Sequence, residues 1–514
     1  MQRDGIIFPD KPEVDLTNGM DYSGNAITPA TNGSRSEWST VGFFGRLNYN
    51  YKERYLLEAN VRADGTSRFR KANRWKIFPS FSVGWNLSHE DFFESWSGAI
   101  NLLKLRASYG SLGNQNTTNW YQTYQTLSIG SSDGLWIMNG KRPNTTAAPN
   151  LVSTALTWET VQSYNVALDW GMLNNRFSGT AEFYIRDTKN MIGYAPELPA
   201  ILGTGVPVTN NTDLRTWGWE LSVAWNDYLS NGLSYGVKFN ISDAQTKITR
   251  YPNNPSNNIW TNVEGRYMNE IWGFTTIGIA KTDEEMKQHL ASLPNGGQDA
   301  LGSDWTAGDI MYADVNGDGK ISKGAEVVGD SGDLSVIGNS TPRYLFGLDM
   351  NAAWKGFDFR VFFQGVMKRD FWQGSTYLFG AASSGQWWAT GLSQVHDYFR
   401  DENTWSVKEG YQTPNLDSYL PRPLYNDKNQ AMQTRYLQNA AYIRLKNLQI
   451  GYSFPKRFIS RWGIERLRIY FSGENLWTGT SLVEQFDPET ISGGAGGNTY
   501  PLSKTLSCGL SVTF

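Results

Sequence analysis

Lys504-Thr-Leu-Ser-Cys-Gly-Leu-Ser-Val-Thr-Phe514 is the stretch that decides the fold class. One side of this stretch, drawn as an extended chain, is apolar and consists of Leu506, Cys508, Leu510, Val512 and Phe514. The other side consists of Thr505, Ser507, Gly509, Ser511 and Thr513. This strict period of two predicts a β-strand with one apolar and one polar face. Ending such a strand on an aromatic ring is common at the closing strand of a membrane β-barrel.

The same alternation recurs along the chain. Apolar residues fill every second position in stretches near 40–50, 55–63, 103–109, 164–170, 177–185, 219–225, 233–241, 342–353, 357–363 and 467–471. The opposite faces hold Arg, Lys, Glu and Asp in mid-strand, where a packed core would make charge costly. Such faces suit either the outside of a soluble sandwich or the wet interior of a large barrel.

The lengths of the connections separate these two cases. Tight turns at 52–53, 174–175, 229–231 and 355 alternate with long excursions at 65–75, 111–156, 188–212, 248–340, 367–441 and 476–502. Short periplasmic turns that alternate with long extracellular loops are typical of an up-and-down transmembrane barrel, whereas a Greek-key sandwich has no reason to keep this parity. The sequence therefore predicts an all-β, antiparallel transmembrane barrel with long extracellular loops.

Composition agrees with this class and excludes others. The 514 residues carry a net charge of −3, which favours no nucleic-acid partner. The 21 Trp, 26 Tyr and 25 Phe are enough for interfacial girdles at the strand ends. One cysteine excludes an internal disulfide, and His89, His289 and His396 show no metal spacing. No nucleophile elbow, phosphate-binding loop or carboxylate pair is evident, so we expect a protein that is not an enzyme.

The N-terminal region sets the expected domain organisation. Residues 1–36 are rich in Gly, Asn, Asp, Ser and Thr and look like a loop at an incomplete edge of the barrel. No secretory signal follows Met1, although a barrel protein must cross the inner membrane. We therefore expect 37–514 to be the C-terminal part of a longer barrel protein.

Several blocks together resemble SusC/RagA-type TonB-dependent outer-membrane transporters. The blocks are Leu156-Thr-Trp-Glu-Thr-Val-Gln-Ser-Tyr-Asn165 with Leu173-Asn-Asn-Arg-Phe-Ser178, Leu103-Lys-Leu-Arg-Ala-Ser-Tyr-Gly110, Ala441-Tyr-Ile-Arg-Leu-Lys-Asn-Leu448, Phe471-Ser-Gly-Glu-Asn-Leu476 and Tyr500-Pro-Leu-Ser-Lys-Thr505. The resemblance spans residues from about 36 to 514, and it is specific only when the blocks are taken together.

The resemblance implies a barrel of about 22 strands with a plugged lumen. By the same resemblance, 37–514 would be the C-terminal part of an outer-membrane barrel that lacks the plug domain. This chain would supply roughly 13–15 of the strands, counting a further hairpin within 118–140. It also implies a SusD-like surface lipoprotein as a lid, TonB acting through the missing N-terminal part, and outer-membrane lipid around the barrel. The implied activity is import of a glycan or peptide nutrient across the outer membrane of a Gram-negative, Bacteroidetes-like cell.

One motif has the pattern of a calcium loop. Asp314-Val-Asn-Gly-Asp-Gly-Lys-Ile-Ser322 alternates oxygen-bearing side chains, and hard Ca²⁺ needs several oxygens around one point. The twelfth position is Ala325 rather than a carboxylate, and Glu326 comes one residue late. The candidate ligands are Asp314, Asn316, Asp318, Lys320, Ser322 and Glu326, and Asp309 and Asp330 are other candidates for the missing carboxylate. The alternative is a metal-free turn rich in Asx and Gly.

Tryptophans in the long loops are the candidates for contact with the substrate or the lid. They are Trp260, Trp272, Trp305, Trp372, Trp387, Trp388 and Trp405. Flat rings stack on sugar faces, but long loops also need small cores of their own, and we favour that packing role.

The alternation slips once, within Tyr442–Phe454. If Leu448 and Ile450 face lipid, Arg444 and Lys446 face it too, unless a bulge near Asn447 resets the register. Because a long loop is adjacent, we expect the two cations to lie at the barrel rim.

Two other functions remain open at this point. A secreted, calcium-stiffened β-sandwich that binds glycans would share the tryptophans and the Asp314 motif, but it would dissolve without detergent. A passive porin-like channel would need no energy coupling.

Overall fold

In the computed structural model, the structure describes residues 6–7, 14–15, 20–21, 30–31, 37–117, 119–127, 129–130, 137–138, 140, 145–146, 149–196, 199, 201, 203–374, 376–379, 396–424, 428–492 and 499–514. The predictions for Trp387 and Trp388, and for most of 1–36, lie outside these residues. The described parts of 1–36 are the strand pairs β1 (Ile6–Ile7) with β4 (Ala30–Thr31) and β2 (Val14–Asp15) with β3 (Met20–Asp21).

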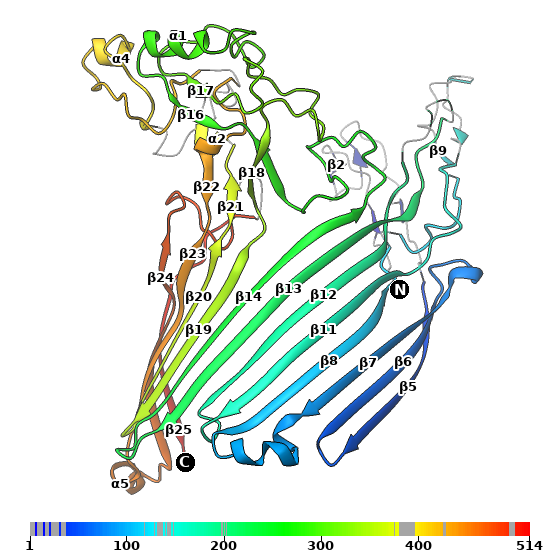
Figure 1. Cartoon of the computed structure of the whole chain (residues 1–514), viewed down its shortest axis with the longest axis vertical. Helices are drawn as coiled ribbons and strands as arrows, with labels where there is room; N and C mark the ends of the chain where they lie inside the picture. Colours follow the sequence, from blue (N-terminus) through cyan, green and yellow to red (C-terminus); the bar gives the residue numbers. More distant parts are fainter. Residues whose placement is uncertain are drawn as a thin grey trace.

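One large antiparallel sheet of 13 strands forms the body of the molecule (Figure 1). Each strand pairs with the next sheet strand along the chain, which leaves β5 and β25 at the edges. The strands are β5 (Thr40–Tyr51), β6 (Tyr55–Thr66), β7 (Trp75–Asn86), β8 (Ile100–Asn114), β11 (Glu159–Met172), β12 (Phe177–Tyr194), β13 (Val208–Tyr228), β14 (Ser234–Arg250), β19 (Arg343–Trp354), β20 (Phe357–Lys368), β23 (Tyr442–Ser453), β24 (Arg466–Thr480) and β25 (Thr505–Thr513). This order confirms the predicted up-and-down antiparallel architecture.

Tight turns alternate with long connections over most of the sheet, as the sequence predicts. The exceptions are the connections 87–99 and 454–465, which lie at the tight-turn end but are longer than the connection 67–74 at the other end. Short turns gather at one end of the sheet and long connections at the other (Figure 1). The tight turns use backbone conformations with positive φ, at Lys52 (50°) and Glu53 (56°) and again at Asn174 (58°) and Asn175 (61°). Two consecutive residues with positive φ match the right-handed twist of a hairpin, and Asn tolerates that conformation well.

The two faces of the sheet differ in chemistry. Apolar side chains on one face remain exposed, at 66% for Phe43, 58% for Val166 and 64% for Leu510. No second large sheet of the described residues stacks on this face. A β-sandwich would bury these side chains between two sheets, so the sandwich alternative is not favoured.

The opposite face carries ion pairs between neighbouring strands. Arg46 lies 2.8 Å from Glu58, Arg106 lies 3.0 Å from Asp169, and Arg360 lies 2.6 Å from Asp349. Each pair joins positions that the alternation assigns to the polar face. Mid-strand charge is therefore paired across strands instead of being buried alone.

A β-bulge in β23 corrects the prediction for Arg444 and Lys446. Phe362 and Phe363 of β20 pair with Asn447 and Leu445, so Lys446 is the inserted residue against β20. Against β24 the register shifts at the same place, where Lys446 faces two residues of β24. Arg444 and Lys446 then turn to Glu489 in the following loop, at 2.9 and 3.0 Å. The prediction assumes an unbroken register in β23, and that assumption is wrong. The extra residue changes which side chains of the strand share a face.

Shorter elements lie in the connections. The strands are β9 (Ile129–Gly130), β10 (Thr145–Thr146), β15 (Glu270–Gly273), β16 (Thr276–Ile279), β17 (Ile310–Tyr312), β18 (Ser335–Asn339), β21 (Asp370–Trp372) and β22 (Leu437–Asn439). The helices are α1 (Asp283–Ala291), α2 (Thr376–Phe379), α4 (Trp405–Lys408) and α5 (Lys456–Ile459), and the 3-10 turns are η1 (Lys71–Asn73), η2 (Leu87–His89), η3 (Asp91–Trp96), η6 (Thr434–Tyr436) and η7 (Ser460–Trp462). In 118–140, the only described strand, β9, pairs outside that range with β10, so the described residues there form no further hairpin.

Among the helices that the structure describes, none is long and apolar enough to cross a membrane.

Candidate functional site

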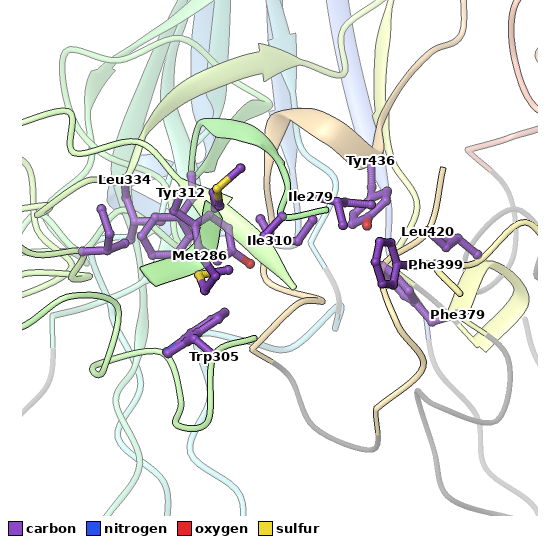
Figure 2. Close-up of a cluster of buried hydrophobic side chains, with 14 of the residues drawn as sticks. Ile279, Met286, Trp305, Ile310, Tyr312, Leu334, Phe379, Phe399, Leu420 and Tyr436 are labelled. Atoms are coloured by element: carbon purple, nitrogen blue, oxygen red, sulfur yellow. The ribbon is translucent and has the colours of Figure 1, made fainter. Parts of the chain in front are cut away.

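Two long connections fold together above one end of the sheet. We call the described residues of 251–342 and 369–441 the loop cap. Its buried side chains form one hydrophobic cluster (Figure 2), which consists of Ile259, Phe274, Ile279, Ala280, Met286, Leu293, Trp305, Ile310, Met311, Tyr312, Ile321, Leu334, Leu378, Phe379, Phe399, Leu420 and Tyr436. Because both connections contribute to this core, neither can bury its apolar side chains without the other.

Helix α1 shows how local sequence builds the cap. The hydroxyl of Thr282 accepts a hydrogen bond from the Glu285 amide, and the Glu285 carboxylate accepts one from the Lys281 amide. The Thr282 cap satisfies the free N–H of Glu285, and the acidic side chains of Asp283 and Glu284 in the first turn favour the positive end of the helix dipole. The helix then directs Met286 into the core.

A fully buried carboxylate joins the two connections. Asp309 accepts hydrogen bonds from Arg422 at 2.7 and 2.8 Å, from Lys428 at 2.9 Å and from Asn429 at 2.8 Å. Burial alone raises the pKa of Asp309, but the hydrogen bonds from Arg422, Asn429 and Lys428 outweigh it and hold the pKa below its ordinary value. Since Asp309 lies in one connection and its three partners lie in the other, the network fixes the two connections to each other.

Buried amides extend this network. Gln298 accepts the Tyr312 amide proton at 2.6 Å and donates to the Ile310 carbonyl at 3.0 Å. The Tyr312 hydroxyl donates to the Lys428 carbonyl at 2.6 Å, and Gln433 donates to the Asn429 carbonyl at 3.0 Å. A buried polar network whose members are paired specifies one arrangement of the loops.

The predicted tryptophans divide into two groups. Trp305 is only 9% exposed and belongs to the core, and Trp272 and Trp372 pack against that core. Trp260 is exposed, and Trp405 is 69% exposed, with its ring 5.5 Å from that of Tyr411. Packing within the loops therefore describes three of these residues, and only Trp260 and Trp405 face solvent among the described tryptophans of the set.

The Asp314 motif forms a tight turn that its own carboxylates organise. Asp314 accepts backbone amide protons from Gly317 at 2.7 Å and Gly319 at 2.8 Å, and Asn316 donates to Asp318 at 3.2 Å. Lys320 and Ser322 donate their backbone amide protons to Asp318 and Asp333, and Glu326 has a positive φ of 56°. The described residues hold no group of three or more His, Cys, Asp or Glu placed to share a metal ion.

Sequence reasoning missed Asp333 beside this turn. Its buried carboxylate accepts amide protons from Val315 and Ser322, both at 2.8 Å. Burial raises the pKa of Asp333, and the negative charge of Asp314 adds to that effect, although amide donors oppose it. Asp333 lies far along the chain from the motif, so no spacing pattern links the two.

A hollow of about 860 Å³ lies against the polar face of β5–β8. Amide and hydroxyl side chains line much of it, namely Asn60, Ser80, Ser111, Asn114, Gln115, Asn116 and Ser163. Phe44 and Leu112 add exposed apolar surface, and Arg62 pairs with Asp64 at 2.6 Å. This lining offers hydrogen bonds and apolar contacts without an unpaired charge.

Sequence reasoning missed these hollow-lining residues because it searched the loops. The signal was available in part, since Asn60 and Ser80 occupy the polar positions of their strands. A second hollow, of about 360 Å³, lies where the loop cap meets β14 and β19, and Gln245, Glu270, Arg343, Lys368 and Asp370 line its polar part.

Comparison with known proteins shows which family shares this architecture. A family model described as TonB dependent receptor-like, beta-barrel matches residues 8–476, which is more than half of the chain. TonB-dependent receptor P3 of Formosa agariphila is 26% identical over 525 residues, covering 97% of this chain and 48% of that protein. TonB-dependent receptor SusC of Bacteroides thetaiotaomicron is 26% identical over 477 residues, covering 92% and 44%.

A solved structure of the RagAB peptide transporter aligns with a TM-score of 0.73 at 22% identity, covering 98% of this chain and 50% of that one. At this identity the match shows a shared fold alone. The chain spans about half the length of the curated relatives that it matches. By its family match and its sheet, the chain belongs to the TonB dependent receptor-like β-barrel family.

Proposed function

We propose that this chain is the barrel portion of an outer-membrane transporter that imports a nutrient with energy supplied through TonB. The observation that carries the proposal is the two-sided sheet: an exposed apolar face for lipid and a charged, paired face for a wet interior. Membership of the family supports the coupling to TonB.

A surface lipoprotein like SusD is the proposed lid. The loop cap stands at the long-connection end of the sheet (Figure 1), where a lid would close the entrance. Trp405 and Tyr411 present exposed rings there, and Trp260 presents another. Exposed aromatic side chains on a rigid support are good anchors for a protein partner.

The hollow on the polar face of β5–β8 is the proposed contact for the nutrient. Its amides and hydroxyls would pair with peptide groups or sugar hydroxyls, while Phe44 and Leu112 would take apolar parts. The fold shared with a structure described as a peptide transporter makes oligopeptides the first class to test, with oligosaccharides as the second.

Uptake by whole cells tests the proposal. Cells with and without the complete gene are given labelled oligopeptide and oligosaccharide pools, and the label that enters the cells is measured. We expect one pool to require both this gene and TonB. Gene-dependent uptake that continues without TonB would show a passive channel instead, and loss of neither pool would refute nutrient import.

We also propose that the Asp314 turn binds one Ca²⁺ that stiffens the loop cap. Asp314 and Asp318 would supply carboxylates and Asn316 an amide oxygen. The buried Asp333 carboxylate accepts the Val315 amide proton and would not be a ligand. A cation there would relieve the burial of negative charge on Asp333.

A further inference from the structure

The outward, apolar face of β8, β11 and β12 contains a groove. This hollow of about 440 Å³ is lined by Phe81, Val83, Ala107, Tyr109, Tyr164, Val166, Phe183 and Ile185, with Ser108 and Asn165 contributing little polar surface. Strand register explains its shape. Ala107 pairs with Val83 on one side and with Val166 on the other, so three short side chains form a floor.

Taller side chains border this floor. In the next row of the sheet, Phe81 pairs with Tyr109 and Tyr109 pairs with Tyr164, whose rings lie 5.1 Å apart. Phe183, paired with Val166, closes the β12 side. A floor of short apolar side chains beneath a wall of rings fits a narrow, flexible hydrocarbon chain.

A charged row crosses the same face nearer the long connections. Gln162, Asp187, Arg215 and Lys247 are cross-strand partners in sequence, so their side chains share one face. The row just below consists of Tyr164, Ile185, Trp217 and Gln245. The two rows are about 7 Å apart, since they are separated by two residues of each strand. The face therefore changes from apolar to charged directly above the groove.

The charges in this region do not balance. Arg215 pairs with Asp187 at 2.6 and 2.8 Å, and its side chain stays 52% exposed. Lys189 lies one row above Asp187, and neither Lys189 nor Lys247 forms an ion pair within the part of the chain that the structure describes. The nearby carboxylates Asp213 and Asp243 are already paired with Arg250 and Arg343. Two positive charges are left in excess on a surface next to an acyl-sized groove.

We propose that this face binds a phosphorylated glycolipid of the outer leaflet. Lys189, Arg215 and Lys247 hold its phosphate, and the groove over Ala107 holds one of its acyl chains. The proposal rests on the outer-membrane location proposed above, which places the long connections and this charged row on the extracellular side. Clusters of Lys and Arg at the edge of a hydrocarbon band recognise anionic lipid headgroups through charge and hydrogen bonds.

Titration of the complete transporter with purified lipid A, followed by native mass spectrometry, tests the phosphate part. We expect the double variant Lys189→Gln/Lys247→Gln to bind lipid A roughly 30-fold more weakly, at about 1 kcal/mol for each lysine. The control is Lys52→Gln/Lys355→Gln, which removes two lysines from short turns at the opposite end of the sheet. The control should bind as the unaltered protein does, and equal binding by both double variants would overturn the proposal.

Filling the groove tests the acyl part. Ala107→Phe should weaken lipid A binding several-fold, because the ring occupies the floor between Val83 and Val166. The control, Ala352→Phe, enlarges an alanine on the same face but on β19, where it pairs with Phe359. Unchanged mobility before and after heating shows that each variant still folds as a barrel. If Ala107→Phe binds lipid A normally in a folded barrel, the groove does not hold the acyl chain.

Two further lipids identify the source of the phosphate. Dephosphorylated lipid A and phosphatidylglycerol should both bind much more weakly than lipid A, and equal binding by either would overturn recognition of an outer-leaflet phosphoglycolipid. Nutrient uptake, measured in the same cells, keeps the two proposals separate. A transporter that imports its nutrient but binds no lipid A refutes only the lipid site, whereas absence of the protein from outer-membrane fractions refutes the proposed function.

Discussion

Single residues were the least predictable scale. The sequence marks Trp305 and Trp405 alike, as loop tryptophans among polar neighbours, yet one is a core residue and the other is exposed. The difference is made by partners far along the chain, such as Lys428, which lies 4.6 Å over the Trp305 ring. Local pattern holds no information about such contacts, which is also why the role of Asp333 could not be inferred.

Asp309→Asn tests the junction inside the loop cap. The change leaves Lys428 and Arg422 without their carboxylate in a buried site, and losing one partner of such a network costs about 3–5 kcal/mol. We expect faster hydrogen exchange at Tyr312 and Ile310 in the complete protein. Asp417→Asn, which breaks an exposed pair with Lys281, should leave that exchange unchanged. Equal exchange in both variants would show that Asp309 does not hold the cap together.

Asp333 gives the Asp314 turn a pH dependence of defined sign. Its folded pKa is raised, so the folded turn holds the proton more tightly than the unfolded chain does. The stabilisation is fully present below the unfolded pKa and is lost as the pH rises through the raised folded pKa. We expect the exchange protection of the Val315 and Ser322 amides to fall over that rise, and added Ca²⁺ to restore it. Protection that increases with pH in the absence of Ca²⁺ would contradict this assignment.

Elements were predictable where alternation was unbroken. Trp75–Asn86 is absent from the predicted strands, and it contains a proline, which is rare inside a strand that pairs on both sides. In the structure, Pro79 lies just beyond the last pair between β7 and β8, Ser80 with Gly110, so that ladder loses no N–H there. The bulge in β23 shows in the sequence only as a break in the apolar and polar alternation. Such a break fits either a bulge or charged side chains on the lipid-facing side, so the sequence does not choose between them.

Deleting Lys446 tests the bulge at the scale of the strand. Lys446 is the extra residue of β23 against β20, so its removal leaves Leu445 and Leu448 two positions apart and keeps both on the outward face. We expect the deletion variant to form a heat-resistant folded barrel on gels. Lys446→Ala removes only the contact with Glu489 and should fold equally well. A deletion variant that does not fold, when Lys446→Ala does, would show that Lys446 does not occupy an inserted position.

The whole molecule was the most predictable scale. Period-two alternation and the parity of the connections are local signals repeated many times, and together they specify one antiparallel sheet with loops at one end. The loop cap could not be derived in this way, because its core assembles from two connections separated by β19 and β20.

Val166→Arg tests which face meets lipid. An arginine on the lipid side near mid-membrane costs about 2–4 kcal/mol, so we expect a lower yield of folded protein in the outer membrane and a lower urea midpoint in lipid vesicles. Ser163→Arg places the same side chain on the opposite face, beside the polar hollow, and should be tolerated. If Ser163→Arg lowers the yield and Val166→Arg is tolerated, the face assigned to lipid is in fact the interior face.

The junction at Asp309 has a consequence for recombination between relatives. Asp309 and Arg422 are 113 positions apart, yet the fully buried Asp309 carboxylate needs the cation of Arg422. Transplanting one of the two segments from a homologue would bring in one side of the Asp309 network without its matching partner. A chimaera with a relative should therefore fold its loop cap only when both segments are exchanged together, with β19 and β20 between them.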